Sequence, residues 1–241
     1  MVNKVNDDII ITTHRKKYDL RINTLPKEIF GDLIIKASAN ARHFSLDYKE
    51  IIVHGNLIIE GRISIDCEKL IVHKSIITMP GSQLFANPRK GVYVGGSAEF
   101  MNSKIFLSKT FIENELIVSG GTAHLSIPAN TSTIPGITTY PECDSIWNRQ
   151  EIRGKTTVKD DVTVMDNGRL LLYSDFISEG DIYIKRNGVI KAYESMKAKG
   201  NIVIENGKLF IDENKLWTGG KIIINNENEN NPQNEGVEIN R

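Results

Sequence analysis

The last third of the chain alternates apolar and polar residues, and this alternation repeats with a period of twenty residues. The segments that begin at Asp160, Gly180 and Gly200 read DDVTVMDNGRLLLYSDFISE, GDIYIKRNGVIKAYESMKAK and GNIVIENGKLFIDENKLWTG. Their alignment produces two apolar columns, two positions apart: Val162, Ile182, Ile202 and Ile222, and then Val164, Ile184, Ile204 and Ile224. A spacing of two places both members of a pair on the same face of a β-strand.

A turn signal follows each apolar pair. The sequences DNG, RNG and ENG stand at 166–168, 186–188 and 205–207. An Asn-Gly step is typical of tight bends that require a positive φ. Each turn precedes a second alternating stretch and then a weaker third apolar position near Phe176, Met196 and Leu216. Each repeat therefore predicts three short strands separated by corners.

Two architectures fit short strands joined by Asn-Gly turns: a series of antiparallel hairpins, or a solenoid. The fixed period favours the solenoid, because a meander has no reason to return to the same residues at constant intervals. Stacked coils lie about 4.8 Å apart. We therefore predict an all-β fold, a parallel β-helix (β-solenoid) with three-strand coils of about 20 residues. The glycines predicted at its corners, where a side chain would meet the stacked neighbour or not fit the turn, are Gly31, Gly55, Gly180, Gly200 and Gly220.

The pattern divides the chain into five segments. Residues 151–225 are predicted to form regular coils, and residues 31–127 form less regular ones, in which the phrases FGDLII and HGNLII recur. Residues 128–150 contain three prolines and no alternation, which indicates a loop excursion from one coil or a connection between two stacked segments. Residues 1–30 are interpreted as an N-terminal cap segment, and the polar residues 226–241 as a disordered tail.

Composition narrows the function classes. The 241 residues carry 30 basic and 30 acidic side chains, so no overall field attracts nucleic acid or an anionic membrane. The N-terminus has the pattern of neither a signal peptide nor a transmembrane segment. Cys67 and Cys143 have no metal-ligand spacing and are interpreted as two unrelated reduced thiols. We expect a cytoplasmic protein, with export without a cleaved signal peptide as the alternative.

Two sets of residues raise chemical hypotheses. His54 and His73 each follow an apolar strand residue, nineteen positions apart, so they would stack on neighbouring coils and bind a metal, or simply face solvent. Aspartates line the grooves of some β-helix enzymes, but they are also common at corners and on surfaces; the candidates are Asp160, Asp161, Asp166, Asp175 and Asp181. No phosphate-binding loop, nucleophile elbow or zinc-protease motif is present in the sequence. We therefore expect no catalytic residue, no cofactor and no metal site.

Three aromatic residues are candidates for a partner surface. Trp147 and Tyr140 stand in the predicted excursion, and Trp217 stands at a repeat corner in NKLWTGG. Such rings serve as platforms for a sugar or a protein. Trp217 would equally pack against the edge of the stack.

The phrases GDIYIKRNGVIKA and KAKGNIVIENGKLFI resemble the repeats of bactofilins, the bacterial polymer-forming cytoskeletal proteins. The resemblance covers residues 155–225 and, more loosely, residues 31–77. It implies a three-sided β-helix that assembles end to end into filaments without nucleotide, often at the membrane, as a scaffold for envelope proteins.

The leading hypothesis is a non-enzymatic structural scaffold or protein-interaction β-solenoid that self-assembles through its coil ends. Each end of a solenoid presents unpaired strand edges, which pair with another chain unless they are covered. The expected partner is the protein itself or another protein, with no nucleic acid. One alternative is a polysaccharide-active β-helix enzyme, and another is a secreted effector or adhesin-like binding module.

Overall fold

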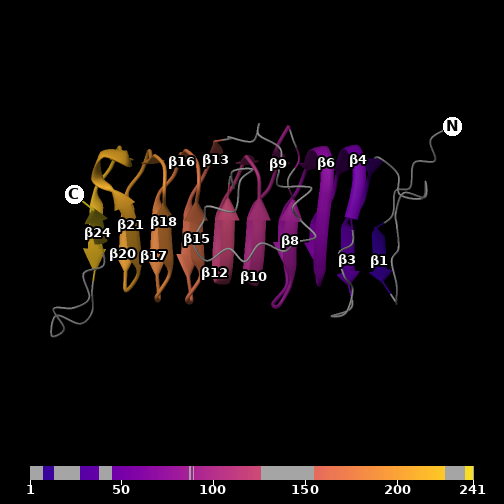
Figure 1. Cartoon of the computed structure of the whole chain (residues 1–241), viewed down its shortest axis with the longest axis horizontal. Coiled ribbons are helices and arrows are strands. Elements are labelled where there is room, and N and C mark those ends of the chain that lie inside the picture. The colour runs from indigo at the N-terminus through magenta and orange to yellow at the C-terminus, as the bar shows by residue number, and fades with distance from the viewer. Residues whose placement is uncertain are drawn as a thin grey trace.

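The strands lie side by side, across the long axis of a rod, with β1 (Ile9–Thr13) near one end of the rod and β24 (Val237–Asn240) near the other (Figure 1). This computed structural model describes residues 8–13, 28–37, 45–86, 88, 90–125, 155–225 and 237–240. The strand pairings within this part of the chain are all parallel, and its helical content is a single 3-10 turn at Glu213–Lys215. The predicted all-β parallel solenoid is confirmed.

Three columns of paired strands form the faces of the solenoid, which we call faces A, B and C. Face A contains β1 (Ile9–Thr13), β3 (Leu33–Ala37), β5 (Leu57–Ile59), β7 (Ile76–Thr78), the first halves of β10 (Ala98–Leu107) and β12 (Leu116–Leu125), β14 (Val162–Met165), β17 (Ile182–Lys185), β20 (Ile202–Glu205) and β23 (Ile222–Asn225). Face A therefore runs the whole length of the rod.

Face B follows face A in each coil. It contains the first halves of β4 (Ser45–Val53) and β6 (Arg62–Val72), β8 (Gln83–Ala86), the second halves of β10 and β12, β15 (Arg169–Leu172), β18 (Val189–Ala192), β21 (Lys208–Asp212) and β24 (Val237–Asn240).

Face C completes the coil. It contains β2 (Glu28–Ile29), the second halves of β4 and β6, β9 (Val92–Val94), β11 (Thr110–Ile112), β13 (Thr156–Val158), β16 (Phe176–Ser178), β19 (Met196–Ala198) and β22 (Leu216–Thr218).

The core consists of the inward-facing residues of all three faces. Ile182 pairs with Ile202, and Ile202 pairs with Ile222, so the twenty-residue period of the sequence corresponds to one coil of the solenoid. The side chains of Ile182 and Ile202 are fully buried, whereas Tyr183 between the two apolar columns faces outward and is partly exposed. One continuous hydrophobic cluster extends from Ile29 to Ile211. Its burial is the main stabilising contribution, about 1.5–3 kcal/mol for each fully buried aliphatic side chain.

The Asn-Gly turns between faces A and B differ from the expectation in one respect. The positive φ falls on the two residues before each glycine, at 54° and 62° for Asp166 and Asn167 and at 46° and 63° for Arg186 and Asn187. Glycine is needed for a different reason, because a Cβ on Gly188 would lie 2.2 Å from the carbonyl oxygen of Val164 in the preceding coil. Asparagine tolerates this left-handed conformation better than most residues. In each Asn-Gly step, the asparagine therefore meets the requirement for a positive φ, and the glycine meets the requirement for close contact with the preceding coil.

The strand pairing between coils continues across the predicted excursion. β12 ends at Leu125 and β13 begins at Thr156, yet β13 pairs with β11 while β12 pairs with β14. In the next coil, the same corner between faces B and C takes three residues, from Leu172 to Phe176. The strands on either side of the long segment therefore belong to adjoining turns of one solenoid. Residues 128–150 themselves lie outside the described part of the chain.

Both terminal segments contribute strands. β1 and β2, from the predicted cap segment, pair with β3 and β4, and β24, from the predicted tail, pairs with β21. The other residues of 1–30 and 226–241 lie outside the described ranges, apart from Asp8 and residues 28–30. Within the described ranges, no helix has the length and apolar character needed to span a membrane.

Candidate interaction surfaces

A ladder of Asp and Asn side chains runs along the corner between faces C and A. The Asp181 carboxylate accepts a hydrogen bond from the backbone amide of Asn201 at 2.6 Å, and Asn201 Oδ1 accepts one from the amide of Lys221 at 3.0 Å. Near the other end, Asp8 accepts from the amide of Asp32 at 2.8 Å, and Asp32 from that of Asn56 at 2.6 Å. Each side chain thus caps the amide of the equivalent residue in the next coil. We call this series the corner ladder.

The ladder explains the residues that follow the corner glycines. A backbone amide at this corner has no strand partner of its own, and an unpaired buried amide is costly. An Asp or Asn side chain satisfies it in every coil where one is present. The hydrogen bond from the Asn201 amide is the largest cause of the lowered pKa of Asp181, and the Tyr183 hydroxyl also donates to this carboxylate, at 3.1 Å.

The predicted corner glycines lie directly before the ladder residues: Gly31, Gly55, Gly180, Gly200 and Gly220. The amide of Gly200 donates to the carbonyl of Gly180 at 3.1 Å, and that of Gly220 to the carbonyl of Gly200 at 3.0 Å. A Cβ on Gly200 would lie 2.0 Å from Asp181 Oδ1. Close stacking therefore excludes a side chain here, and φ at Gly200 is not in the left-handed range.

The last coil leaves the apolar core open. Ile222 and Ile224 continue the two inward-facing columns of face A, but they are 39% and 48% exposed, whereas Ile202 and Ile204 in the preceding coil are 0% exposed. Isoleucine in such a column is otherwise covered by the coil above it. The C-terminal end therefore presents an uncovered apolar surface.

Trp217 lies at the same end of the rod. It belongs to β22, pairs with Lys197 and is 52% exposed. Its exposure leaves the ring accessible to a partner. The two other predicted platform residues, Trp147 and Tyr140, lie outside the described residues, so the structure brings no predicted aromatic cluster together.

The two ends carry opposite charges at equivalent positions. Asp8 begins the corner ladder, and Lys221 occupies the same column in the last coil of face A. Lysine has no acceptor, so its side chain cannot continue the ladder. An acidic side chain therefore stands at one end of the column and a basic one at the other.

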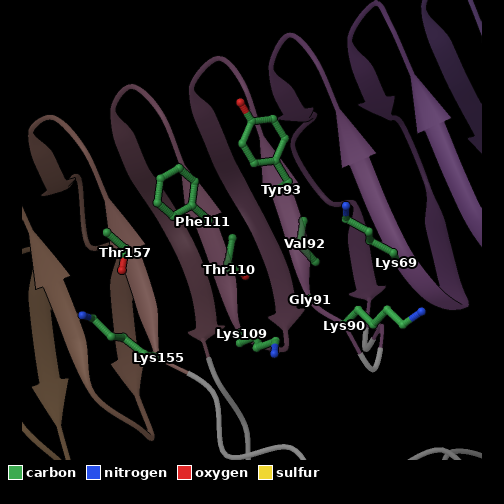
Figure 2. A pocket seen from close by; sticks show the side chains of 10 residues that line it. All are labelled: Lys69, Lys90, Gly91, Val92, Tyr93, Lys109, Thr110, Phe111, Lys155 and Thr157. Atoms are coloured by element: carbon green, nitrogen blue, oxygen red, sulfur yellow. The ribbon is translucent and has the colours of Figure 1, made fainter.

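A groove on face C contains a column of lysines (Figure 2). Lys69, Lys109 and Lys155 each stand immediately before the face C segment of their coil, and Gly91 takes the equivalent place between the first two. The groove is about 180 Å³ in volume. Tyr93 and Phe111 form its wall, with nearly parallel rings whose centroids are 5.9 Å apart.

The lysines of this groove are mostly without an ion pair. Several other lysines on the rod pair with an acidic residue one coil away; Glu179, for example, lies 3.0 Å from both Lys159 and Lys199, which lowers its pKa. In the groove, Lys90 pairs with Glu68 at 3.0 Å. The three column lysines form no ion pair with any residue that the structure describes. The groove therefore holds an excess of positive charge.

His54 and His73 do stack on neighbouring coils, with ring centroids 4.8 Å apart. Phe30 stacks on the other side of His54 at 4.6 Å, and His54 Nε2 lies 2.8 Å from Glu28 Oε1. The pair thus forms part of an aromatic ladder at a partly exposed corner. Within the described ranges, no three His, Cys, Asp or Glu side chains converge as metal ligands.

His124 is a buried residue that the sequence did not single out. Its ring stacks on Phe106 at 4.4 Å, and its Nδ1 lies 3.0 Å from the Tyr173 hydroxyl. Burial, with a smaller contribution from Lys104, lowers the pKa of His124 to about 4. The side chain is therefore neutral at pH 7 and serves packing.

The candidate carboxylates take part in corner structure. Asp161 accepts from the amide of Asp181 at 2.7 Å, as a member of the corner ladder. Asp166 pairs with Arg186 at 3.0 Å, and Asp175 accepts from the Ser195 hydroxyl. Asp160 contributes its backbone carbonyl to Ser178 and Gly180. These contacts agree with the interpretation as corner and surface residues.

Comparisons of the chain with family models, with curated proteins and with solved structures found no match in any of the three. The fold class therefore rests on the strand pairings, and the resemblance to bactofilins stays a hypothesis.

Proposed function

We propose that the protein is a non-enzymatic structural scaffold whose copies join end to end through their terminal coils. The observation that carries this proposal is the exposure of Ile222 and Ile224, two residues whose counterparts Ile202 and Ile204 are fully buried. An exposed continuation of the core is a typical mark of an interface.

Backbone edges support the same conclusion. Among the described strands, β23 pairs with β20 alone, and β1 pairs with β3 alone. The amide of Ile202 donates to the carbonyl of Lys221, in the next coil, at 2.9 Å. Ile222 is the equivalent residue of the last coil, so its amide points along the axis to the position that a further coil would occupy. Open edges of this kind pair readily with another chain. A second copy would supply the carbonyl of its Asp8 to the Ile222 amide.

Charge favours a head-to-tail arrangement. Stacking β1 of one copy on β23 of another places Asp8 next to Lys221, because both residues belong to the corner column. A tail-to-tail arrangement would instead bring two Lys221 ends together. Opposite charges at a junction set its register and orientation more than its strength.

A second copy fits these edges better than an unrelated partner. Both ends of face A present parallel strands in the same column, so the junction repeats the pairing geometry found inside the rod. Such a head-to-tail contact does not close on itself and generates a filament. The resemblance to bactofilins, which assemble end to end, agrees with this proposal.

The test is assembly of the purified chain. Light scattering and negative-stain microscopy should show oligomers or filaments that grow with concentration. Replacing Ile222 and Ile224 together with lysine should abolish them, because charge would enter the apolar junction. Ile223→Lys is the matched control, since this residue faces outward on the same strand. A wild-type protein that stays monomeric at high concentration would refute the proposal.

A further inference from the structure

We propose that the groove on face C is a binding site for a linear acidic polysaccharide. This site is separate from the coil ends, and the proposal does not depend on assembly. Three observations carry it: the column of lysines, the aromatic wall beside that column, and the shallow open form of the groove.

The lysine column provides three charges along the rod, separated by two coils and then by one. Lys109 and Lys155 stand in adjacent coils, about 4.8 Å apart at the spacing of paired strands. Lys69 stands two coils from Lys109. None of the three lysines forms an ion pair within the described chain, and the acidic residues nearest to them in the column are Glu50, in register with Lys69, and Asp175, which follows Lys155 in the next coil. An external anion with repeated charges would supply the partners that these lysines lack.

Gly91 forms the floor of the groove between Lys69 and Lys109. Its φ is +98°, and a Cβ at this position would lie 2.8 Å from Cγ of Lys109. The Lys109 stem therefore lies directly on the buried backbone of Gly91 and bridges the gap in the column. Figure 2 shows Gly91 between the strand segments that carry the lysines.

The wall of the groove favours sugar rings. Tyr93 and Phe111 present apolar ring surface beside the lysines, and Thr157 adds a hydroxyl in the next coil. Aromatic rings pack against apolar faces, and hydroxyl and ammonium groups bind polar substituents. A chain of acidic sugars carries both features in every unit: one apolar ring face and one carboxylate or sulfate.

The form of the groove indicates a polymer and not a compact ligand. A volume of about 180 Å³ is small, and the lysine column spans four successive coils, from Lys69 to Lys155, between Glu50 and Asp175. Enclosed small-molecule sites are typically larger, roughly 300–1,000 Å³. A linear chain that lies along the rod would contact the lysines one after another.

Nucleic acid fits these observations less well. The residues that line the groove include no arginine, the residue that best matches phosphate geometry. The chain has no net charge, so no long-range field gathers a highly charged nucleic acid. The lysine ammonium group acts as a point charge, and it binds a carboxylate without the paired donors that an arginine side chain offers to phosphate.

The experiment uses the full chain and fluorescently labelled polygalacturonate oligomers. Anisotropy titrations should show saturable binding that weakens as salt rises. The variant Lys109→Ala/Lys155→Ala should bind about tenfold more weakly, since two partly solvated charges together contribute roughly one decade of affinity. Lys74→Ala/Lys208→Ala is the control, because it removes the same charge from positions outside the groove.

The control probes separate the outcomes. Uncharged dextran of similar length should not bind, and a single-stranded thymidine oligonucleotide should bind more weakly than polygalacturonate. The proposal is overturned if polygalacturonate does not bind, if the groove and control variants lose affinity equally, or if the oligonucleotide binds more tightly. Assembly of the variants, measured in parallel, reports on the scaffold proposal independently.

Discussion

The Asp181 carboxylate accepts a hydrogen bond from the backbone amide of Asn201, one coil further along the rod, at 2.6 Å. This contact gives the Gly-Asp and Gly-Asn phrases of the sequence a physical reason. The glycine allows two coils to approach closely. The Asp or Asn side chain accepts a hydrogen bond from a backbone N–H group that has no partner in the strand pairing. The repeated phrase is thus a structural unit of the corner and not a chemical motif.

Removing the acceptor should destabilise the corner. We expect Asp181→Ala to lower the free energy of unfolding by about 1–3 kcal/mol, the range for leaving a backbone donor unsatisfied. Asp181→Asn should cost less, because it keeps an acceptor oxygen. Urea denaturation of both variants checks this. Equal losses would show that the hydrogen bond is not the stabilising contact.

The same carboxylate should respond to acid. Its pKa is lowered in the folded state, so it contributes stability at pH values above its unfolded pKa, and this contribution disappears as the pH falls through the folded pKa. Asp181→Asn removes that titration and should therefore flatten the acid limb of the stability curve.

His124 should make the fold sensitive to mild acid. Its pKa is lowered to about 4, below the ordinary value of 6.5, so the unfolded chain binds a proton before the folded chain does. Stability should therefore fall as the pH drops from 7 to 4.5, by about 2 kcal/mol from this group.

His124→Phe provides the comparison, since it keeps the ring between its neighbours and cannot titrate. Denaturation midpoints at pH 7 and pH 4.5 should differ less in this variant than in the wild type. A wild-type loss that the variant shares in full would assign the effect to other groups.

The long corner between Leu125 and Thr156 should be dispensable for folding. The next coil makes the same corner with three residues, 173–175. Replacing residues 126–154 with the dipeptide Tyr-Ser, copied from 173–174, retains Lys155 and shortens the connection. We expect a cooperative thermal transition at an unchanged midpoint, measured by circular dichroism. A broadened transition would show that the replaced segment contributes to the stack.

The end charges should control assembly. Lys221→Glu places two acidic groups at the proposed junction, and Asp8→Lys places two basic ones there. Each variant alone should raise the concentration needed for assembly, and the double variant should restore it in part. Light scattering at two salt concentrations checks this, since screening weakens repulsion between exposed charges. Single variants that assemble as the wild type does would contradict the head-to-tail arrangement.

The fold could be predicted because its coils are of nearly constant length in residues 160–225. Ile182 and Ile202 occupy equivalent positions, so the pairing register is visible in the sequence alone. The corner glycines were placed by the same alignment. The hydrogen bond between Asp181 and Asn201 was not predicted, since a repeated polar residue does not reveal whether it faces solvent or its own copy.

The groove could not be predicted from the sequence. Lys69, Gly91, Lys109 and Lys155 are separated by 22, 18 and 46 residues. No constant period aligns them, and only the strand pairings bring them into one column. His124 was missed for a related reason: alternation marks it as outward-facing, and the aromatic rings that cover it come from Phe106 and Tyr173 in other coils.

The parallel pairings of face A determine how the rod resists a pulling force. Hydrogen bonds between coils run along its length, so a load pulling the two ends apart is shared by all the bonds of one level at once. Force applied to a free chain terminus acts differently, because it peels one strand after another. A string of such rods would therefore withstand tension well while it yields readily to unravelling from an end.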